Sequence, residues 1–220
     1  MKIKKKRIVI VSGGSIDDDF AKDFLSGKSF DAVIAADKGM EFCYRNQIPV
    51  DLVVGDFDSA DLKVVAFYEK QKVPIRRLVP EKDDSDTQSA LYAASEMGAE
   101  EVIFLGCTGT RLDHIWANIQ LLACCQRQGI HAVLYDAHNR ISVETESFTV
   151  RKNKQFGDYI SFFSLGDCVP DLTLRGFKYP LTNHFLKNTD SGLTVSNEIV
   201  EDEARVSFRG GMLLMIQSKN

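Results

Sequence analysis

The chain has 220 residues, of which 44% are hydrophobic, so it is long enough to bury one large core or two smaller ones. Charged residues make up 26%, the net charge is −4 at pH 7, and no basic stripe is present, which argues against nucleic-acid binding. No apolar stretch approaches the length of a membrane span, and the basic run at residues 2–7 precedes too short an apolar segment for a secretory signal.

Up to about residue 139 the sequence alternates short apolar runs with helix-length segments. The runs are rich in Val and Ile and several are apolar at consecutive positions, which is typical of strands buried on both faces of a parallel sheet. They cover residues 7–12, 31–36, 51–54, 75–79, 101–105 and 130–135. Helices are expected at 62–71, 87–97 and 112–128. This alternation predicts a doubly wound, mostly parallel α/β sheet with right-handed crossovers.

The pattern changes from about residue 141. Segments such as ISVETESFTV and DYISFFSL alternate or cluster β-branched and aromatic residues between turn signals such as Gly210-Gly211. Short strands at this spacing predict an antiparallel sandwich or barrel. We place the boundary so that an α/β domain covers 1–139 and a β domain covers 140–220.

Five cysteines are present, an odd number, and none of them forms a Cys-x-x-Cys pair. Cys124 and Cys125 are adjacent inside an apolar helical stretch, where cysteine usually behaves as a small core hydrophobe. This pattern argues against a disulfide scaffold or a zinc site. We therefore expect a reduced, cytoplasmic setting.

Several of the expected strands run directly into polar loops. Ligands of open α/β sheets bind beyond the carboxyl ends of the strands, so these loops are expected to meet along one edge. The acidic residues that they carry are Asp37, Asp56, Asp58, Asp83 and Asp86. Carboxylates crowded in this way repel one another unless a cation lies between them. Taken singly, each loop has a plainer explanation, either as a solvated loop or as a helix N-cap.

The acidic residues predict a magnesium site. Mg²⁺ prefers oxygen ligands, keeps several waters and binds substrate phosphates with few protein ligands. Asp56, Asp58 and Asp86 are the best candidates, because the alternation in Asp56-x-Asp58 at a strand end can turn both carboxylates toward one ion.

The loop after the fifth expected strand predicts complementary chemistry. Gly106 and Gly109 allow backbone N–H groups to approach an anion near a helix N-terminus, and Arg111 can pair with phosphate oxygens. His114 and Asn118 lie four residues apart and share one face of the helix, and both are candidate substrate-binding residues. His114 is explained equally well as a substrate contact or as a capping or packing residue.

Two further features are expected to be structural. Trp116 is predicted to face the core. The segment SGGS at residues 12–15 is weaker evidence for a site, because it does not match GxGxxG and a tight turn explains it.

In their order and spacing, the motifs resemble those of the bacterial thiamine pyrophosphokinases. The matching segments are AADKGMEFCYRNQIPVDLVVGDFDS (35–59), KDDSDTQSAL (82–91), GTRLDHIWANI (109–119) and YPL…TVSNE (179–198). The resemblance extends over nearly the whole chain, including its all-β second half. Thr110 departs from the Gly-Gly-Arg that the family often has, and Tyr179 stands where some relatives carry Trp.

This resemblance implies transfer of a diphosphoryl group from ATP to the hydroxyl of thiamine, giving thiamine diphosphate and AMP, with Mg²⁺ as the metal ion. It implies an α/β catalytic domain followed by a β-sandwich domain. It also implies a homodimer in which the α/β domain of one subunit and the β domain of its mate form the substrate sites.

Carried over by motif, Asp56, Asp58 and Asp86 would organise Mg²⁺ and the ATP phosphates. Asp37 and Asp83 would lie in the same acidic rim. All of them would act through charge and position, since diphosphoryl transfer depends on these more than on covalent catalysis.

Arg111 and Asp113 would flank the reacting groups, and Asp113 is the candidate acceptor of the hydroxyl proton. In the β domain, Tyr179 would supply an aromatic face that attracts the thiamine cation. Ser196 would donate a hydrogen bond to the pyrimidine, with Asn197 beside it. Ordinary strand packing explains Tyr179 nearly as well, and a turn hydroxyl explains Ser196.

Other functions remain open on the residues alone. The acidic loops would serve another Mg²⁺-dependent nucleotide phosphotransferase or hydrolase equally well, although a pocket around Tyr179 and Ser196 would not. A non-catalytic thiamine-binding protein would not need a full set of metal and phosphate ligands. A structural dimer with an acidic rim stabilised by Ca²⁺ is the third alternative.

Overall fold

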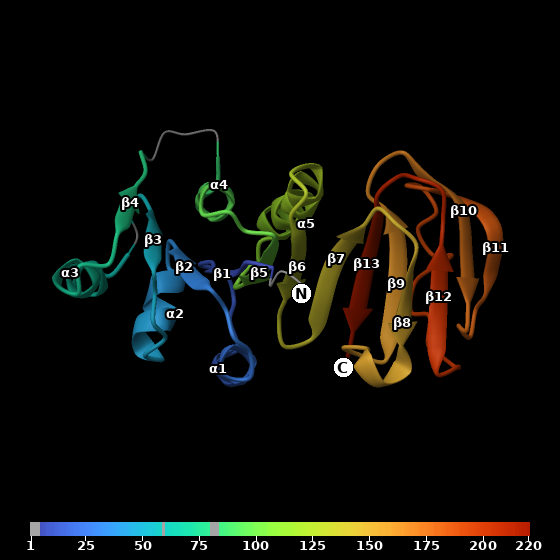
Figure 1. The fold of residues 1–220 in the computed structure, drawn as a ribbon, viewed down its shortest axis with the longest axis horizontal. Coiled ribbons are helices and arrows are strands. Elements are labelled where there is room, and N and C mark those ends of the chain that lie inside the picture. The colour runs from blue at the N-terminus through green and yellow to red at the C-terminus, as the bar shows by residue number, and fades with distance from the viewer. Residues whose placement is uncertain (1–4, 59, 80–83) are drawn as a thin grey trace. The chain divides into compact units, whose positions relative to one another are not determined.

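The computed structural model describes residues 5–58, 60–79 and 84–220 (Figure 1). The chain forms two compact units, Met1–Ala137 and His138–Asn220. The division falls in the short connection between strands β6 (His131–Tyr135) and β7 (Asn139–Glu144). The sequence placed it between residues 139 and 140.

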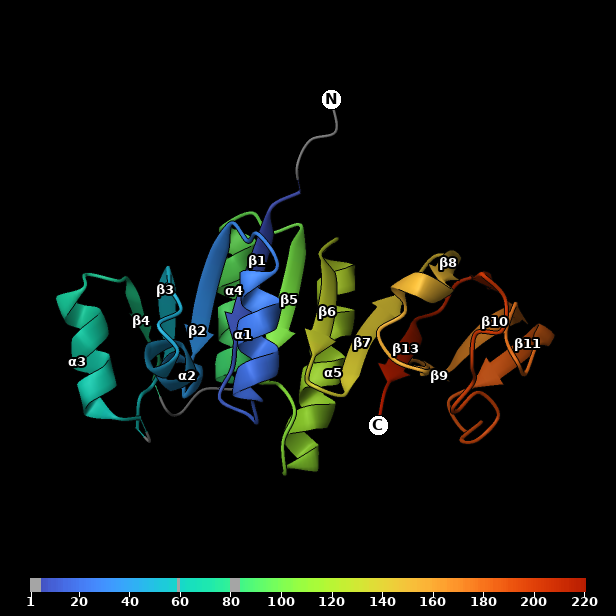
Figure 2. The same cartoon turned by 90° about the horizontal axis from the view of Figure 1, so that it is seen from below.

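Parallel strands form the sheet of the N-terminal unit. They are β1 (Arg7–Val11), β2 (Ala32–Ala36), β3 (Leu52–Gly55), β4 (Ile75–Arg77), β5 (Glu101–Leu105) and β6. They lie in the order β4-β3-β2-β1-β5-β6, and each neighbouring pair is parallel. Figure 2 shows the arrows of β2 and β5 pointing the same way. The order reverses between β1 and β5, so ligands are expected at this switch point.

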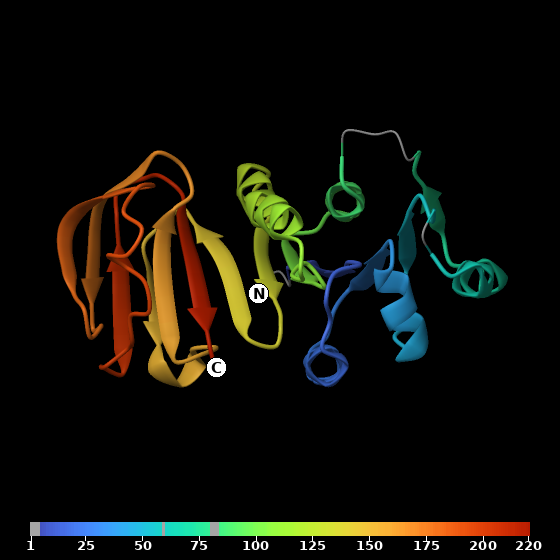
Figure 3. The same cartoon turned by 180° about the vertical axis from the view of Figure 1, so that it is seen from behind.

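Helices cover both faces of this sheet. They are α1 (Asp18–Ser26), α2 (Gly39–Arg45), α3 (Leu62–Lys70), α4 (Asp86–Glu96) and α5 (Leu112–Arg127). Helices α1, α2 and α3 share one buried cluster with the strands. Figures 1 and 3 show α1 and α2 on one face and α4 and α5 on the other. The predicted doubly wound α/β sheet is confirmed.

Side-chain caps explain where several of these helices begin. Asp17 accepts a hydrogen bond from the backbone N–H of Phe20 at the start of α1, at 2.8 Å. Ser85 accepts one from the N–H of Gln88 at the start of α4, at 3.2 Å. A capping oxygen satisfies an N–H that has no partner inside the helix. The Ser85 cap therefore fixes the residue at which α4 begins.

Antiparallel strands form two sheets in the C-terminal unit. One holds β7, β13 (Leu213–Ser218) and β9 (Tyr159–Ser164), in that order. The other is four-stranded, with β11 (Leu181–Lys187), β10 (Cys168–Arg175), β12 (Glu203–Ser207) and β8 (Phe148–Arg151), and a short 3-10 helix, η1 (Lys152–Lys154), follows β8. Side chains from both sheets, among them Phe162 and Leu174, share one buried cluster. The predicted antiparallel β-sandwich is confirmed.

The prediction for Trp116 is wrong, because its side chain is 53% exposed. Helix α5 buries Ile119, Leu122 and Cys125 instead. Leu112 and Trp116 lie four residues apart and share the exposed side of the helix. An aromatic residue inside an apolar stretch thus did not reveal which side of the helix faces the sheet.

All five cysteines are free thiols. Burial raises the pKa of the Cys43 and Cys107 thiols to about 12. Both therefore stay protonated at neutral pH, as inert core residues do. Among the helices in the described parts of the chain, none is both long and apolar enough to cross a membrane.

Close packing of α2 against β1 requires glycine at position 39. A Cβ atom there would overlap the carbonyl oxygen of Val11. We expect Gly39→Ala to lower the free energy of unfolding by at least about 2 kcal/mol, because the backbone of β1 or α2 has to shift. Urea unfolding followed by circular dichroism measures this.

Gly192→Ala is the matched control, because no atom lies within 4 Å of its Cβ position. It should change the free energy of unfolding by less than about 0.5 kcal/mol. An equally small change for Gly39→Ala would contradict the packing of α2 on β1.

Candidate functional site

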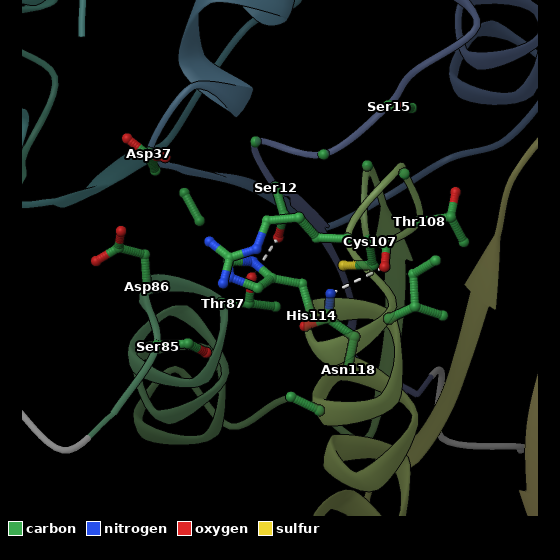
Figure 4. Close-up of a pocket in the computed structure, with 18 of the residues that line it drawn as sticks. Ser12, Ser15, Asp37, Ser85, Asp86, Thr87, Cys107, Thr108, His114 and Asn118 are labelled. Carbon is green, nitrogen blue, oxygen red and sulfur yellow. Dashed lines mark hydrogen bonds between the residues drawn. The ribbon is translucent and has the colours of Figure 1, made fainter. Parts of the chain in front are cut away.

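A pocket of about 770 Å³ lies at the carboxyl end of the parallel strands, around the switch point (Figure 4). Segment 12–15 after β1, segment 36–38 after β2 and segment 106–111 after β5 line it, together with residues 85–87 and the first turns of α5. All of these belong to the N-terminal unit. Of the polar loops expected to meet at one edge of the sheet, those after β2 and β5 and the end of the one before α4 line this pocket, and the one after β3 does not.

The loops after β1 and β5 are joined by backbone hydrogen bonds. Gly14 N–H donates to the carbonyl of Gly106 at 2.8 Å, and Ser15 N–H donates to the carbonyl of Thr108 at 2.7 Å. A Cβ atom at position 14 would overlap the carbonyl oxygens of both Gly106 and Thr108. The SGGS segment, for which a tight turn was the preferred explanation, thus forms one wall of the pocket. Its position after the first strand was the signal that could have identified it.

Asp37 is an acid of the pocket whose pKa is raised in the folded protein. Its backbone has φ 49°, which is unusual for a residue other than glycine. Its Oδ1 atom is buried, and no described residue donates a hydrogen bond to it. Burial raises the pKa of Asp37, and the negative charges of Asp86 and Asp56 raise it further. The carboxylates of Asp86 and Asp56 are therefore each close enough to repel that of Asp37.

Asp56 and Asp58 do not line the pocket. Strand β3 ends at Gly55, and the next residues are not extended, because Phe57 has φ 62° and its ring is buried. Strand alternation therefore does not orient the two carboxylates. Asp58 is exposed, and its N–H donates to Oδ1 of Asp56 at 3.1 Å.

Asp86 is the first residue of α4 and lines the pocket near Asp37 (Figure 4). The next residue, Thr87, is buried and donates a hydrogen bond from Oγ1 to Oγ of Ser12 at 3.0 Å. This bond ties the start of α4 to the loop after β1. Asp83, the other acid predicted in this loop, lies outside the described residues. Within the described parts of the chain, no group of three His, Cys, Asp or Glu side chains is arranged to hold a metal ion.

Arg111 and Asp113 form an exposed ion pair at the start of α5. Arg111 Nη2 lies 2.5 Å from Asp113 Oδ2, and Arg111 Nε donates to Asp113 Oδ1 at 3.2 Å. The guanidinium lowers the pKa of Asp113, chiefly through these hydrogen bonds. Arg111, the N-cap residue of α5, makes no side-chain capping hydrogen bond, and the first turn of the helix lines the pocket.

The two remaining residues predicted on α5 differ in their environment. His114 is exposed and lies at the pocket (Figure 4). Asn118 also lines the pocket, but its Nδ2 donates to the carbonyl of Cys107 at 2.9 Å. Asn118 thus supports the loop after β5. Lys38, an exposed cation beside Asp37 in the pocket wall, was not singled out from the sequence.

The residues predicted to bind thiamine belong to the C-terminal unit. The Tyr179 side chain is 57% exposed, and Ser196 is exposed with φ 55°. Asn197 is only 2% exposed. The structure therefore separates these three predicted residues into two that a ligand can reach and one that it cannot.

A glycine-walled pocket with acids, an arginine and an uncapped helix N-terminus at the switch point of a parallel sheet is typical of α/β proteins that bind phosphorylated ligands. Two family models match this chain. The catalytic domain of thiamin pyrophosphokinase matches residues 26–134, and its vitamin B1 binding domain matches residues 145–213. The chain belongs to the thiamine pyrophosphokinase family.

Known proteins of this name are similar along most of their length. Thiamine pyrophosphokinase of Bacillus subtilis (strain 168) is 35% identical over 187 residues, which are 84% of this chain and 86% of that protein. A crystal structure of the Bacillus subtilis protein has a TM-score of 0.86 at 33% identity and covers 98% of this chain and 100% of that one. The structure from Geobacillus thermodenitrificans has a TM-score of 0.81 at 29% identity, with 97% and 98% covered.

Proposed function

We propose that this protein transfers a diphosphoryl group from ATP to thiamine. The hydroxyl oxygen of thiamine attacks the β-phosphorus of ATP, the bond from that phosphorus to the α–β bridging oxygen breaks, and AMP leaves. The hydroxyl proton passes to a carboxylate. The observation that carries the proposal is the pocket at the switch point, in a chain that matches the family's models in both of its parts.

Asp56, Asp58 and Asp86 remain the predicted ligands of Mg²⁺, with Asp37 in the same acidic rim, and the ion would contact only one or two of these acids at a time, because no three acids in the described parts of the chain are arranged around one point. A divalent cation fits the chemistry of these acids, because their ligand atoms are oxygens, the charges of Asp86 and Asp56 raise the pKa of Asp37, and Oδ1 of Asp37 is buried without a donor among the described residues. Mg²⁺ needs only a few protein ligands, because it takes the rest of its coordination shell from water and phosphate. The ion would neutralise charge that develops on the phosphates.

Arg111 would bind the transferred phosphates with its planar fork, and backbone N–H groups of segment 106–111 and of the first turn of α5 would approach them from the same part of the pocket wall. Asp113 stays the candidate proton acceptor. Because Arg111 lowers its pKa, Asp113 becomes a better base only when Arg111 turns from it to phosphate. Arg111 would therefore exchange the Asp113 carboxylate for phosphate oxygens when ATP binds.

Tyr179 and Ser196 would bind thiamine, the first through its exposed ring and the second through its exposed hydroxyl. We expect Tyr179→Ala to raise the KM for thiamine about tenfold, while the KM for ATP changes less than about twofold. Steady-state kinetics with each substrate varied in turn measure the two constants. Equal increases for both substrates would contradict a thiamine-specific role.

We further propose a homodimer, as the family resemblance implies. Large apolar side chains are exposed on α5, where Leu112 is 78% exposed, and in the C-terminal unit, where Phe185 is 52% exposed. Such surfaces are often covered by a partner. Light scattering of the purified protein measures its mass. A cytoplasmic location stays a prediction from the cysteine pattern.

The direct test is incubation with thiamine, ATP and Mg²⁺, followed by mass spectrometry of the products. The proposal expects AMP and thiamine diphosphate in equal amounts, and neither when Mg²⁺ is removed by chelation. Release of ADP or phosphate without thiamine would favour another phosphotransferase or a hydrolase. Saturable thiamine binding without any nucleotide turnover would favour a non-catalytic binding protein.

A further inference from the structure

One buried carboxamide, that of Asn197, is bonded to both backbone groups of Tyr179. Its Oδ1 accepts a hydrogen bond from Tyr179 N–H at 3.0 Å, and its Nδ2 donates to the Tyr179 carbonyl at 2.8 Å. Oδ1 also accepts from the N–H of Glu198 at 3.0 Å. With 2% of its surface exposed, Asn197 cannot offer these atoms to a ligand without giving up the bonds.

Asn197 is itself fixed to strand β9. Its N–H donates to the carbonyl of Ile160 at 3.0 Å, and its carbonyl accepts from Ile160 N–H at 2.8 Å. The preceding residue is fixed in the same way, since Ser196 N–H donates to Oγ of Ser161 at 3.0 Å. These bonds hold Ser196 at its left-handed φ of 55°, which a serine seldom adopts. A rigid strand therefore supports the whole segment.

The ring of Tyr179 has little other support. Its side chain is 57% exposed, so packing does not fix it. The Lys178 ammonium lies 5.7 Å from the ring centroid and is paired with Glu198 at 2.7 Å, at the surface. The place of the ring is thus determined by the backbone of Tyr179, and a single side chain, Asn197, bonds that backbone on both sides.

We propose that Asn197 is a positioning residue for the thiamine-binding face, acting on thiamine only through the ring of Tyr179. This inference rests on the proposed function, because it takes the ring of Tyr179 as the surface that receives the vitamin. It differs from the sequence-based expectation, which placed Asn197 beside Ser196 as a substrate contact. The position demands a primary amide of this length, since one group has to accept and donate at once.

Aspartate separates the two halves of this interaction. Asn197→Asp keeps an oxygen for the N–H groups of Tyr179 and Glu198, but it loses the donor to the Tyr179 carbonyl and sets a negative charge against it. Asn197→Ala loses all three bonds. The damage to thiamine binding should therefore be graded, with alanine worse than aspartate or equal to it.

The experiment is a double-mutant cycle in the full-length protein, with the KM for thiamine and the KM for ATP as readouts. We expect Asn197→Ala to raise the thiamine KM about tenfold and the ATP KM less than about twofold. Because the effect passes through the ring, Tyr179→Ala combined with Asn197→Ala should exceed Tyr179→Ala alone by less than about twofold. Independent, multiplying effects would overturn the proposal.

Gln217→Ala is the matched control. Gln217 is another buried carboxamide of the C-terminal unit, 3% exposed, and its Oε1 accepts from Phe156 N–H at 2.8 Å, with no bond to Tyr179. It should cost stability without changing the thiamine KM. A similar KM increase in Gln217→Ala would show a general loss of structure and overturn the proposal. If Asn197→Ala does not fold, the same cycle is run with Asn197→Asp.

Failure of this inference and failure of the proposed function give different results. If the wild-type protein forms no thiamine diphosphate, the function is wrong. If it does, and Tyr179→Ala raises the thiamine KM while both Asn197 variants leave it unchanged, only the positioning role is wrong.

Discussion

Asp37→Asn is expected to lower kcat about 10²- to 10³-fold without weakening the fold. Asp37 is a partly buried acid of the pocket, and its pKa is raised by burial and by the charges of Asp86 and Asp56. Asparagine has nearly the same shape and tolerates the left-handed backbone at φ 49°. It therefore removes the charge that would face the metal ion and leaves the local geometry intact.

The stability of the same variant should depend on pH. Since the pKa of Asp37 is raised above 3.8 in the folded protein, the folded state holds this proton more tightly than the unfolded state. The contribution of Asp37 to the free energy of unfolding of the wild type is then fully present below pH 3.8, and it is lost as the pH rises through the raised pKa. Relative to wild type, Asp37→Asn should gain stability over that window, measured by urea unfolding in metal-free buffer.

Asp19→Asn is the control for both readouts. Asp19 is 95% exposed in the first turn of α1 and pairs only at the surface, with Lys22 at 3.2 Å. It should leave kcat within about twofold of wild type, because surface ion pairs contribute little. Full activity in Asp37→Asn would exclude a role for this carboxylate in turnover. If Asp37→Asn has a lower free energy of unfolding than wild type at neutral pH, the result would contradict the repulsion of Asp37 by Asp86 and Asp56.

Patterns of burial made the fold predictable from sequence. Strand β1 is buried on both faces, so its apolar residues are consecutive, whereas burial alternates along β12 of the sandwich because only one face of that strand is buried. These patterns involve residues close together in the chain, so they can be recognised in one sequence. The side of α5 that faces the sheet did not follow from composition, and Trp116 was placed wrongly for that reason.

The site was predictable as a set of loops but not as a set of contacts. Chain order brings Asp37, Asp86 and Arg111 to one edge of the sheet, and that much follows from parallel topology. Backbone conformation decides the rest. A left-handed Phe57 removes the strand alternation assumed for Asp56 and Asp58.

Hydrogen bonds between distant segments have no local signature at all. The amide of Asn118 is occupied by the Cys107 carbonyl, and that of Asn197 by the backbone of Tyr179. From the sequence both residues looked like substrate contacts, because an amide near a motif can serve either purpose. Only coordinates show that these two support the segments that a substrate would meet.

Arg111→Ala is expected to lower kcat about 10²- to 10³-fold, because an arginine fork on the transferred phosphates stabilises the charge of the transition state. The free energy of unfolding should not change, since the Arg111–Asp113 pair is exposed, with side chains 67% and 64% accessible. Arg111→Lys keeps the charge but not the fork, so it should recover only part of the loss. Arg151→Ala breaks a comparable exposed pair, with Glu203 at 3.0 Å, and should leave kcat unchanged. If Arg111→Ala behaves like Arg151→Ala, Arg111 is a surface partner of Asp113 and phosphate binding depends on the glycine loops and the metal alone.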